Sequence, residues 1–192
     1  MKRHCKGAPQ LINQLNNDPM KFCVLFLVLL ISGCVVSSPI SSNYDRLAGS
    51  VNKKIRREIP VVVSGFGAMI PKQIHAYAMD FKHEGPISID LGRCYVLRIS
   101  QIALDAFNSD DAIQEHLENR PFTVNNLSFA ICSSSWMDYS APFEFVDRIG
   151  FSNGTIFYKR YDHVTEKFVI LFTETYEEAL QKCPSFIQPS QL

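Results

Sequence analysis

The chain has 192 residues, and its 19 basic and 19 acidic side chains give a formal net charge of zero. A hydrophobic fraction of 46% with 20% charged residues is typical of a globular protein and excludes a disordered, collagen-like or coiled-coil chain. Because positive charge is not in excess, we expect no nucleic-acid partner.

The N-terminal region begins with a basic segment and continues with an apolar run from Phe22 to Val36, 15 residues without a charge. This layout is typical of a secretory signal, and the run is shorter than the roughly 20 residues that a membrane-spanning helix needs. We therefore predict a signal peptide or signal anchor over residues 1–33. The segment before Met20 is long for a signal, so the true start is either Met1 or Met20.

The apolar run contains the sequence Ile31-Ser32-Gly33-Cys34, which resembles the lipobox of bacterial lipoproteins. The resemblance implies that the thiol of Cys34 carries a diacylglyceryl group. The three residues before it, Ile31, Ser32 and Gly33, would form the cleavage motif. A lipidated cysteine holds more than one acyl chain, which is enough for stable anchoring. We therefore expect a membrane-anchored protein of the bacterial cell envelope; the alternative is an uncleaved single-pass signal anchor in which Cys34 is a buried thiol.

The next segment, residues 34–58, is rich first in serine and then in basic residues, and we predict a polar tether. Four basic side chains fall within five positions, at Lys53, Lys54, Arg56 and Arg57. Close to an anchor, such a cluster would contact anionic lipid headgroups, at on the order of 1 kcal/mol per basic residue. The alternative is a solvated start to the folded domain.

The body of the chain, residues 59–183, is predicted to begin with a β-hairpin and two helices. Two β-like runs, residues 60–70 and 74–81, are separated by only three residues, too few for a helical crossover. A helix with Ser88 as its N-cap follows, and a short helix is expected over residues 112–117. The apolar face of the long helix is predicted from residues with helical spacing, at Leu91, Tyr95, Ile99, Ile102 and Ala106.

The second half of the body is predicted to consist mainly of strands. An Asn153-Gly154 pair marks a tight turn, and Thr175 with Glu178 has capping-box spacing for a final helix. Strands in runs, without strict alternation with helices, predict an α+β fold: one mostly antiparallel sheet with helices packed on one face. The expected strands cover residues 124–132, 148–151, 155–161 and 168–172, and residues 184–192 form a tail.

Several short motifs occur within residues 60–180: Gly65-x-Gly67, Asn108, Leu117 with Arg120-Pro121-Phe122-Thr123, Gly154-x-Ile156-x-Tyr158 and Glu174-Thr-Tyr-Glu-Glu-Ala179. These motifs resemble those of a group of uncharacterised secreted or lipid-anchored proteins found in intracellular bacteria. The resemblance implies an envelope location and a single domain. It supplies no catalytic residues.

Candidate cofactor and metal residues are few. The stretch Gly65-Phe66-Gly67 lacks the third glycine and the following helix of a dinucleotide site. His75, Asp80 and His83 are close in sequence, but on one strand the two histidines would lie roughly 26 Å apart. We therefore predict no metal and no cofactor.

The cysteines and acidic residues of the body have structural interpretations. Cys94 and Cys132 fall at core-like positions, although either could be a nucleophile. Together with Cys183 they could form one disulfide, whose pairing the sequence leaves open. Acidic residues from Glu174 to Glu178 suit a helix start, where they favour the helix dipole.

Two functions follow from these patterns. The first is a lipid-anchored, non-catalytic binding or interaction domain whose partners are membrane lipid and an envelope protein or other envelope component. The second is an envelope hydrolase with a site of dispersed residues near the aromatic loop 133–142.

Overall fold

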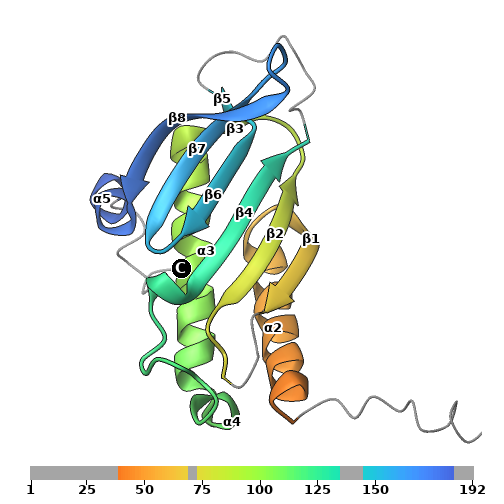
Figure 1. The fold of residues 1–192 in the computed structure, drawn as a ribbon, viewed down its shortest axis with the longest axis vertical. Coiled ribbons are helices and arrows are strands. Elements are labelled where there is room, and N and C mark those ends of the chain that lie inside the picture. The colour runs from red at the N-terminus through yellow and green to blue at the C-terminus, as the bar shows by residue number, and fades with distance from the viewer. Residues whose placement is uncertain (1–38, 69–72, 135–144, 184–192) are drawn as a thin grey trace, which may run out of the picture. The chain divides into compact units, whose positions relative to one another are not determined.

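The computed structural model describes residues 39–68, 73–134 and 145–183 (Figure 1). The signal region, Cys34 with its cleavage motif, most of the aromatic loop and the tail lie outside these residues. None of the helices in the described part of the chain combines the length and the apolar character needed to cross a membrane.

Helix α2, Pro39–Glu58, occupies most of the segment expected to be a tether. Its inner side buries Tyr44, Leu47, Val51 and Ile55, each at most 4% exposed. These positions are three or four residues apart, which is the spacing of one helix face. Two of the serines that favoured a tether, Ser41 and Ser42, lie near the start of this helix. The folded domain therefore begins at residue 39 instead of residue 59, which corrects the predicted boundary.

A six-stranded sheet forms the body of the fold, with strand order β1-β2-β4-β6-β7-β8. Neighbouring strands are antiparallel except β2 and β4, which are parallel. The predicted α+β class with a mostly antiparallel sheet is thus confirmed. The strands are β1 (Val61–Ala68), β2 (Tyr77–His83), β4 (Leu127–Ser133), β6 (Arg148–Ser152), β7 (Thr155–Asp162) and β8 (Lys167–Thr175).

The parallel strands β2 and β4 are connected through helix α3, Ile89–Ser109. A tight turn cannot join parallel strands, because the chain must return to the same end of the sheet. Ser88 caps this helix as predicted, since its Oγ accepts a hydrogen bond from the backbone N of Leu91 at 3.2 Å. The smaller elements are β3 (Ile87–Ser88) paired with β5 (Phe145–Val146), α4 (Asp111–Gln114), a 3-10 turn (Val124–Asn126) and α5 (Tyr176–Lys182).

Two local predictions from turn and cap chemistry are confirmed. Asn153 and Gly154 have φ values of 49° and 70°, as a two-residue turn between antiparallel strands requires. Thr175 and Glu178 form a reciprocal capping box at the start of α5: the backbone N of Glu178 donates to Thr175 Oγ1 at 3.1 Å, and the backbone N of Thr175 donates to Glu178 Oε2 at 2.8 Å.

Helices α2 and α3 pack on the same face of the sheet (Figure 1). Strand side chains alternate between the two faces, so Tyr77, Met79 and Phe81 of β2 are buried against the helices whereas Asp80 and Lys82 are exposed. We call the side that packs on the helices the covered face and the opposite side the open face.

The buried side of α3 is rotated relative to the predicted one. Leu91 is 39% exposed, whereas Gly92 and Val96 are buried. A β-carbon on Gly92 would lie 2.0 Å from Cδ1 of Ile149, so α3 approaches β6 too closely for a larger residue. The hydrophobic spacing predicted the helix, and the close approach to the sheet selected which side faces inward.

Candidate functional site

The open face carries three rows of side chains that cross the sheet, as the register of the paired residues defines. The first row has only small or hydroxyl-bearing residues: Gly67, Ala78, Ser128, Ser152, Thr155 and Thr175. The second row consists of Gly65, Asp80, Ala130, Gly150, Phe157 and Thr173. The third row consists of Val62, Lys82, Cys132, Arg148, Lys159 and Ile170.

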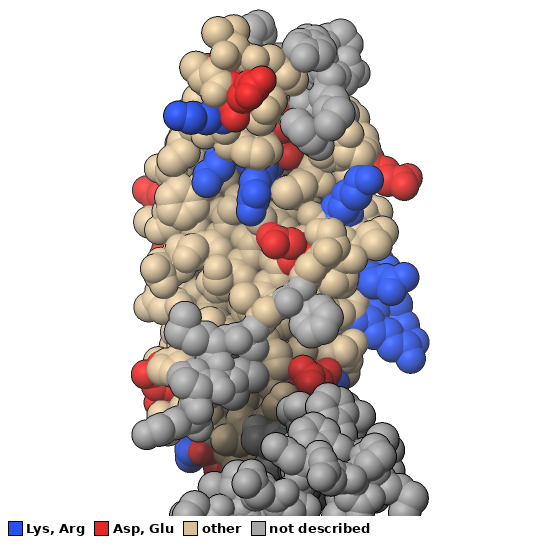
Figure 2. All heavy atoms as spheres, turned by 45° about the vertical axis from the view of Figure 1, so that its right-hand side comes forward, with Lys and Arg blue, Asp and Glu red and all other residues tan. Residues whose placement is uncertain are grey.

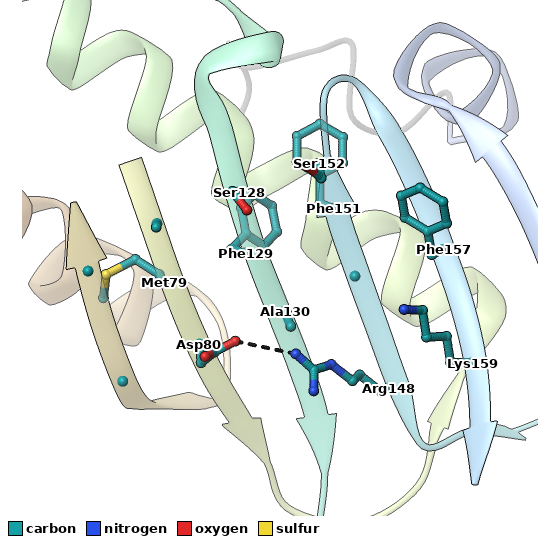
Figure 3. A pocket seen from close by; sticks show the side chains of 14 residues that line it. Met79, Asp80, Ser128, Phe129, Ala130, Arg148, Phe151, Ser152, Phe157 and Lys159 are labelled. Carbon is teal, nitrogen blue, oxygen red and sulfur yellow. Dashed lines mark ion pairs between the residues drawn. The ribbon is translucent and has the colours of Figure 1, made fainter. Parts of the chain in front are cut away.

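The small residues of the first two rows leave a hollow of about 520 Å³ above the sheet. Glycine and alanine add little bulk, so backbone atoms form much of its floor. Ser128 and Ser152 contribute hydroxyl groups from neighbouring strands, and Phe157 contributes a ring from β7 (Figure 3). The hollow therefore offers hydrogen-bonding groups and one apolar ring on an otherwise flat surface.

The third row contains three cations, and two of them, Arg148 and Lys159, line this hollow. Lys82, Arg148 and Lys159 come from β2, β6 and β7, and Arg148 and Lys159 are direct partners in the register. Like charges directly opposite on adjacent strands destabilise a sheet. The direct opposition of Arg148 and Lys159 is therefore unfavourable in itself.

Asp80 compensates this positive charge in part. Its Oδ1 atom lies 3.8 Å from Nη2 of Arg148, and the two side chains point toward one another across β4 (Figure 3). Two aromatic rings also hold the cations against the sheet: Arg148 lies 5.9 Å from the ring centroid of Phe168, and Lys159 lies 5.6 Å from that of Phe157.

Cys132 lies between Lys82 and Arg148 in the third row, half-buried on the open face. Burial raises the pKa of its thiol, and the opposing influences of Arg148, which lowers the pKa, and Asp80, which raises it, leave the pKa above its ordinary value. A thiol with a raised pKa stays protonated and is a poor nucleophile. Among the described residues, the hydrolase alternative therefore gains no support from this cysteine.

The histidines considered as metal ligands lie in separate contacts. His75 pairs with Glu118 just before β2, whereas Nδ1 of His83 lies 3.2 Å from the carbonyl oxygen of Gly85. His83 is on the covered face and Asp80 on the open face. No cluster of three potential ligands forms within the part of the chain that the structure describes.

Glu174 is the centre of a buried charge cluster on the covered face, and it belongs to β8 instead of the helix start where the sequence placed it. Its Oε1 accepts hydrogen bonds from Arg93 Nε at 2.7 Å and from Tyr158 OH at 2.5 Å. Its Oε2 accepts one from Lys182 Nζ at 2.8 Å. Burial by itself would raise the pKa of Glu174, but these hydrogen bonds hold the pKa below its usual value. The cluster fastens α3 and α5 to the sheet.

A disulfide joins Cys94 of α3 to Cys183, which directly follows α5, with Cα atoms 6.5 Å apart. It settles the pairing that the sequence left open, and of the three body cysteines Cys132 is the free thiol. The bond closes a sequence separation of 89 residues. Structural disulfides persist in oxidising compartments and are rare where thiols are kept reduced.

The basic cluster of Lys53, Lys54, Arg56 and Arg57 lies exposed on α2. Three of these residues, all except Lys54, border a hollow of about 700 Å³ that also touches Val63 of β1. Figure 2 shows basic side chains gathered at the right-hand edge of the view and a second group in its upper half. At 1.5 Å per residue, the cluster lies roughly 21–27 Å along the helix from its start.

Three residues from the short motifs of the body, Asn108, Gly154 and Tyr158, have structural roles. Asn108 donates to the carbonyl oxygen of Phe122 at 2.9 Å and accepts from its backbone N at 2.7 Å. Gly154 occupies a turn position with positive φ, and Tyr158 bonds to Glu174. These residues explain how the chain folds and assign no chemistry.

Sequence reasoning missed the open face as a site. Its only sequence signal is the occurrence of small or polar residues at alternate positions of β2, β4 and β6, and the partners become visible only when the strands are in register.

Comparison with protein-family models, with curated proteins and with solved structures finds no match.

Proposed function

We propose that this chain is a lipoprotein of the bacterial cell envelope, anchored through Cys34, whose α+β domain binds an anionic ligand on its open face without catalysis. The lipobox-like sequence supports the anchor. The disulfide between Cys94 and Cys183 supports an oxidising compartment. The ligand is an envelope component that carries carboxylate or phosphate groups.

The observation that carries the binding proposal is the pairing of Arg148 with Lys159 on an uncovered face. Two cations held opposite one another, with Lys82 in the same row, disfavour the folded state. An anion placed over the row would remove this repulsion and gain charge-assisted hydrogen bonds. The adjacent hollow of about 520 Å³ gives room for the remainder of the ligand beside the hydroxyls and Phe157.

The anchor and the fold together limit the distance between the domain and the bilayer. Helix α2 begins at Pro39, five residues after Cys34. Five extended residues span at most about 18 Å, so the domain stays close to the membrane surface. The basic cluster at Lys53, Lys54, Arg56 and Arg57 reaches anionic headgroups only if α2 lies along that surface, which makes membrane contact by these four residues a second part of the proposal.

The anchor is tested by intact mass and N-terminal peptide analysis of the full protein extracted from membranes, beside a Cys34→Ala variant. We expect an N-terminus at Cys34 with the added mass of a diacylglyceryl group, absent from the variant. An intact Met1 or Met20 N-terminus without lipid would contradict the lipoprotein proposal and indicate a signal anchor.

The ligand site is tested by titrating the full protein in detergent micelles with inorganic pyrophosphate and, separately, with a hexaglutamate peptide. Arg148→Gln should weaken binding of the recognised anion at least tenfold, because it removes a charge-assisted contact. Lys167→Gln is the matched control, since Lys167 has the same charge and lies outside the three rows. The two probes distinguish phosphate from carboxylate recognition. Absence of saturable binding to both, or equal losses in both variants, would contradict the proposal.

The membrane contact is tested by co-sedimentation with vesicles of zwitterionic lipid with and without anionic lipid. Replacing all four basic residues of the α2 cluster by glutamine should reduce binding of the Cys34→Ala protein to anionic vesicles and leave its binding to zwitterionic vesicles unchanged. Equal binding of both proteins to anionic vesicles would exclude this contact.

A further inference from the structure

Strand β8 is the last strand of the sheet and has an apolar outer surface. Its five central residues, Phe168, Val169, Ile170, Leu171 and Phe172, are between 39% and 56% exposed. They are five of the eight exposed large hydrophobic residues in the described part of the chain. Proteins normally protect an edge strand with charges, proline or bulges, because its free backbone groups can pair with another chain.

The opposite edge strand, β1, shares some features with β8: neither carries a charge or proline in its apolar stretch, and each has one shift of register. The strands differ in two respects. Strand β1 contains Gly65 and Gly67 and lies beside a hollow bordered by basic residues of α2, whereas β8 has no glycine from Phe168 to Phe172. The two edges of this sheet are therefore not equivalent.

The apolar residues of β8 are exposed on both faces of the sheet. Ile170 lies opposite Lys159 on the open face, and Phe172 lies opposite Tyr158 on the covered face. A helix or a membrane surface would cover only one of these faces. A strand paired along the edge brings side chains within about 4.5–5.5 Å on both faces at once. The surface of β8 therefore fits an added strand.

We propose that this strand is β8 of a second copy, so that two chains pair edge to edge in an antiparallel arrangement and form one continuous sheet. A two-fold axis, which is the symmetry of most homodimers, would pair β8 of one copy with β8 of the other. Residues 168–173 contain no ionisable side chain, so identical strands meet there without charge repulsion. The pairing requires neither the lipid anchor nor an anionic ligand, and it goes beyond the proposed function.

The exposed apolar area indicates a reversible dimer. With roughly 150–250 Å² for a large side chain, the exposed fractions of these five residues amount to on the order of 400 Å² per copy. Two copies would bury about 800 Å² of this surface, below the 1,200–2,000 Å² of stable complexes. We therefore expect monomer and dimer to exchange, with the dimer favoured at high protein concentration.

A photo-crosslinking experiment tests the pairing with the full chain in its native membrane. A photoreactive phenylalanine analogue replaces Ile170 in one series and Val62 in the other, and two differently tagged copies are co-expressed. Val62 is the matched control because it is 55% exposed on the opposite edge strand. We expect a crosslinked product that carries both tags from position 170 and none from position 62. A product with lipid alone, or equal products from both positions, would overturn the proposal.

A second measurement starts from the protein without any substitution. In the unmodified protein in detergent micelles, hydrogen exchange of those amides between Phe168 and Phe172 that do not bond to β7 should slow by at least tenfold as the protein concentration rises through the dimerisation range. Sedimentation equilibrium on the same samples should show the dimer, and Ile170→Lys should abolish it while Val62→Lys retains it. Exchange that is independent of concentration in a protein that stays monomeric would also overturn the pairing.

Discussion

The two faces of the sheet are built from the same strands but carry different kinds of side chain. On the covered face, large side chains such as Phe81, Ile131 and Ile149 are fully buried, and the one carboxylate at its edge, Glu174, is completely paired. On the open face, small residues alternate with cations, and Arg148 faces Lys159. Packing and pairing within the domain explain the first face, whereas the second is the face on which we propose that an anionic ligand binds.

The strongest test of the covered face is Glu174→Ala. Removing the carboxylate leaves Arg93 buried without its principal partner, so we expect the free energy of unfolding to fall by about 3–5 kcal/mol. Glu177→Ala is the control, because Glu177 is exposed on α5 and should change stability by less than about 0.5 kcal/mol. Urea denaturation measures both. Similar small losses would show that the buried cluster does not stabilise the covered face.

Removal of the disulfide should cause the next largest loss of stability. Replacing both Cys94 and Cys183 by serine should lower the free energy of unfolding by about 2–5 kcal/mol, because the unfolded chain gains the freedom of a long loop. Cys132→Ser removes a free thiol from the open face and should have a much smaller effect. Peptide mapping without reductant should identify the linked pair, and a Cys132-containing disulfide would contradict the structure.

Because α3 packs closely on the sheet, we expect Gly92→Ala to cause a moderate loss of stability. The new β-carbon would overlap Cδ1 of Ile149, so we expect a loss of about 1–3 kcal/mol from overpacking. Gly49→Ala in α2 is the matched control, since a β-carbon there would meet no neighbouring atom within 4 Å, and it should stabilise the helix by up to about 1 kcal/mol. Thermal and urea unfolding distinguish the two outcomes, and a neutral Gly92→Ala would remove the argument for close approach.

Low pH should reduce the stability of the folded protein because it protonates Glu174. The folded-state pKa of Glu174 lies below its ordinary value, so its contribution is fully present above the unfolded-state pKa, near 4.3. The contribution is lost as the pH falls from there through the folded-state pKa. Stability measured between pH 6 and pH 2 should therefore fall more steeply for the natural protein than for Glu174→Gln. Parallel curves would contradict the lowered pKa.

The smallest effect, and the sharpest test of the comparison, is Lys159→Gln on the open face. Removing one of two opposed cations should raise the free energy of unfolding by a few tenths of a kcal/mol, while binding of the anionic probe weakens. Lys167→Gln should change neither by a comparable amount. A loss of stability with Lys159→Gln would show that this cation supports the fold, and the open face would lose its main argument for a ligand.

Local patterns predicted much of the fold. The hairpin, the long helix with its Ser88 cap, the Asn153-Gly154 turn and the Thr175 capping box all depend on residues close together in sequence, and the structure confirms each of them. Helix α2 was missed because its buried face is only part of a polar, serine-rich and basic segment. The apolar side of α2 can be recognised as a buried face only when the helix is seen packed on the sheet.

The candidate site depended on contacts that sequence distance hides. Lys82 is far from Arg148 and Lys159 in the sequence, and the three residues come to lie in one row through three strand pairings. The same is true of Glu174 with Arg93, and of Cys94 with Cys183. No periodicity predicts such partners, because register and strand order are set by the packing of the whole domain.

Local sequence patterns predicted the α+β class and most helices and strands, with α2 the exception, and they contain the lipobox-like segment on which the anchor proposal rests. Those features follow from side-chain periodicity, turn chemistry and composition, which act over a few residues. Only the tertiary structure decided which face of the sheet is open, which cations meet there, which cysteines pair and which edge strand is apolar. The physical reason is that these properties arise from long-range contacts, and long-range contacts exist only after the strands have paired and the helices have covered one face.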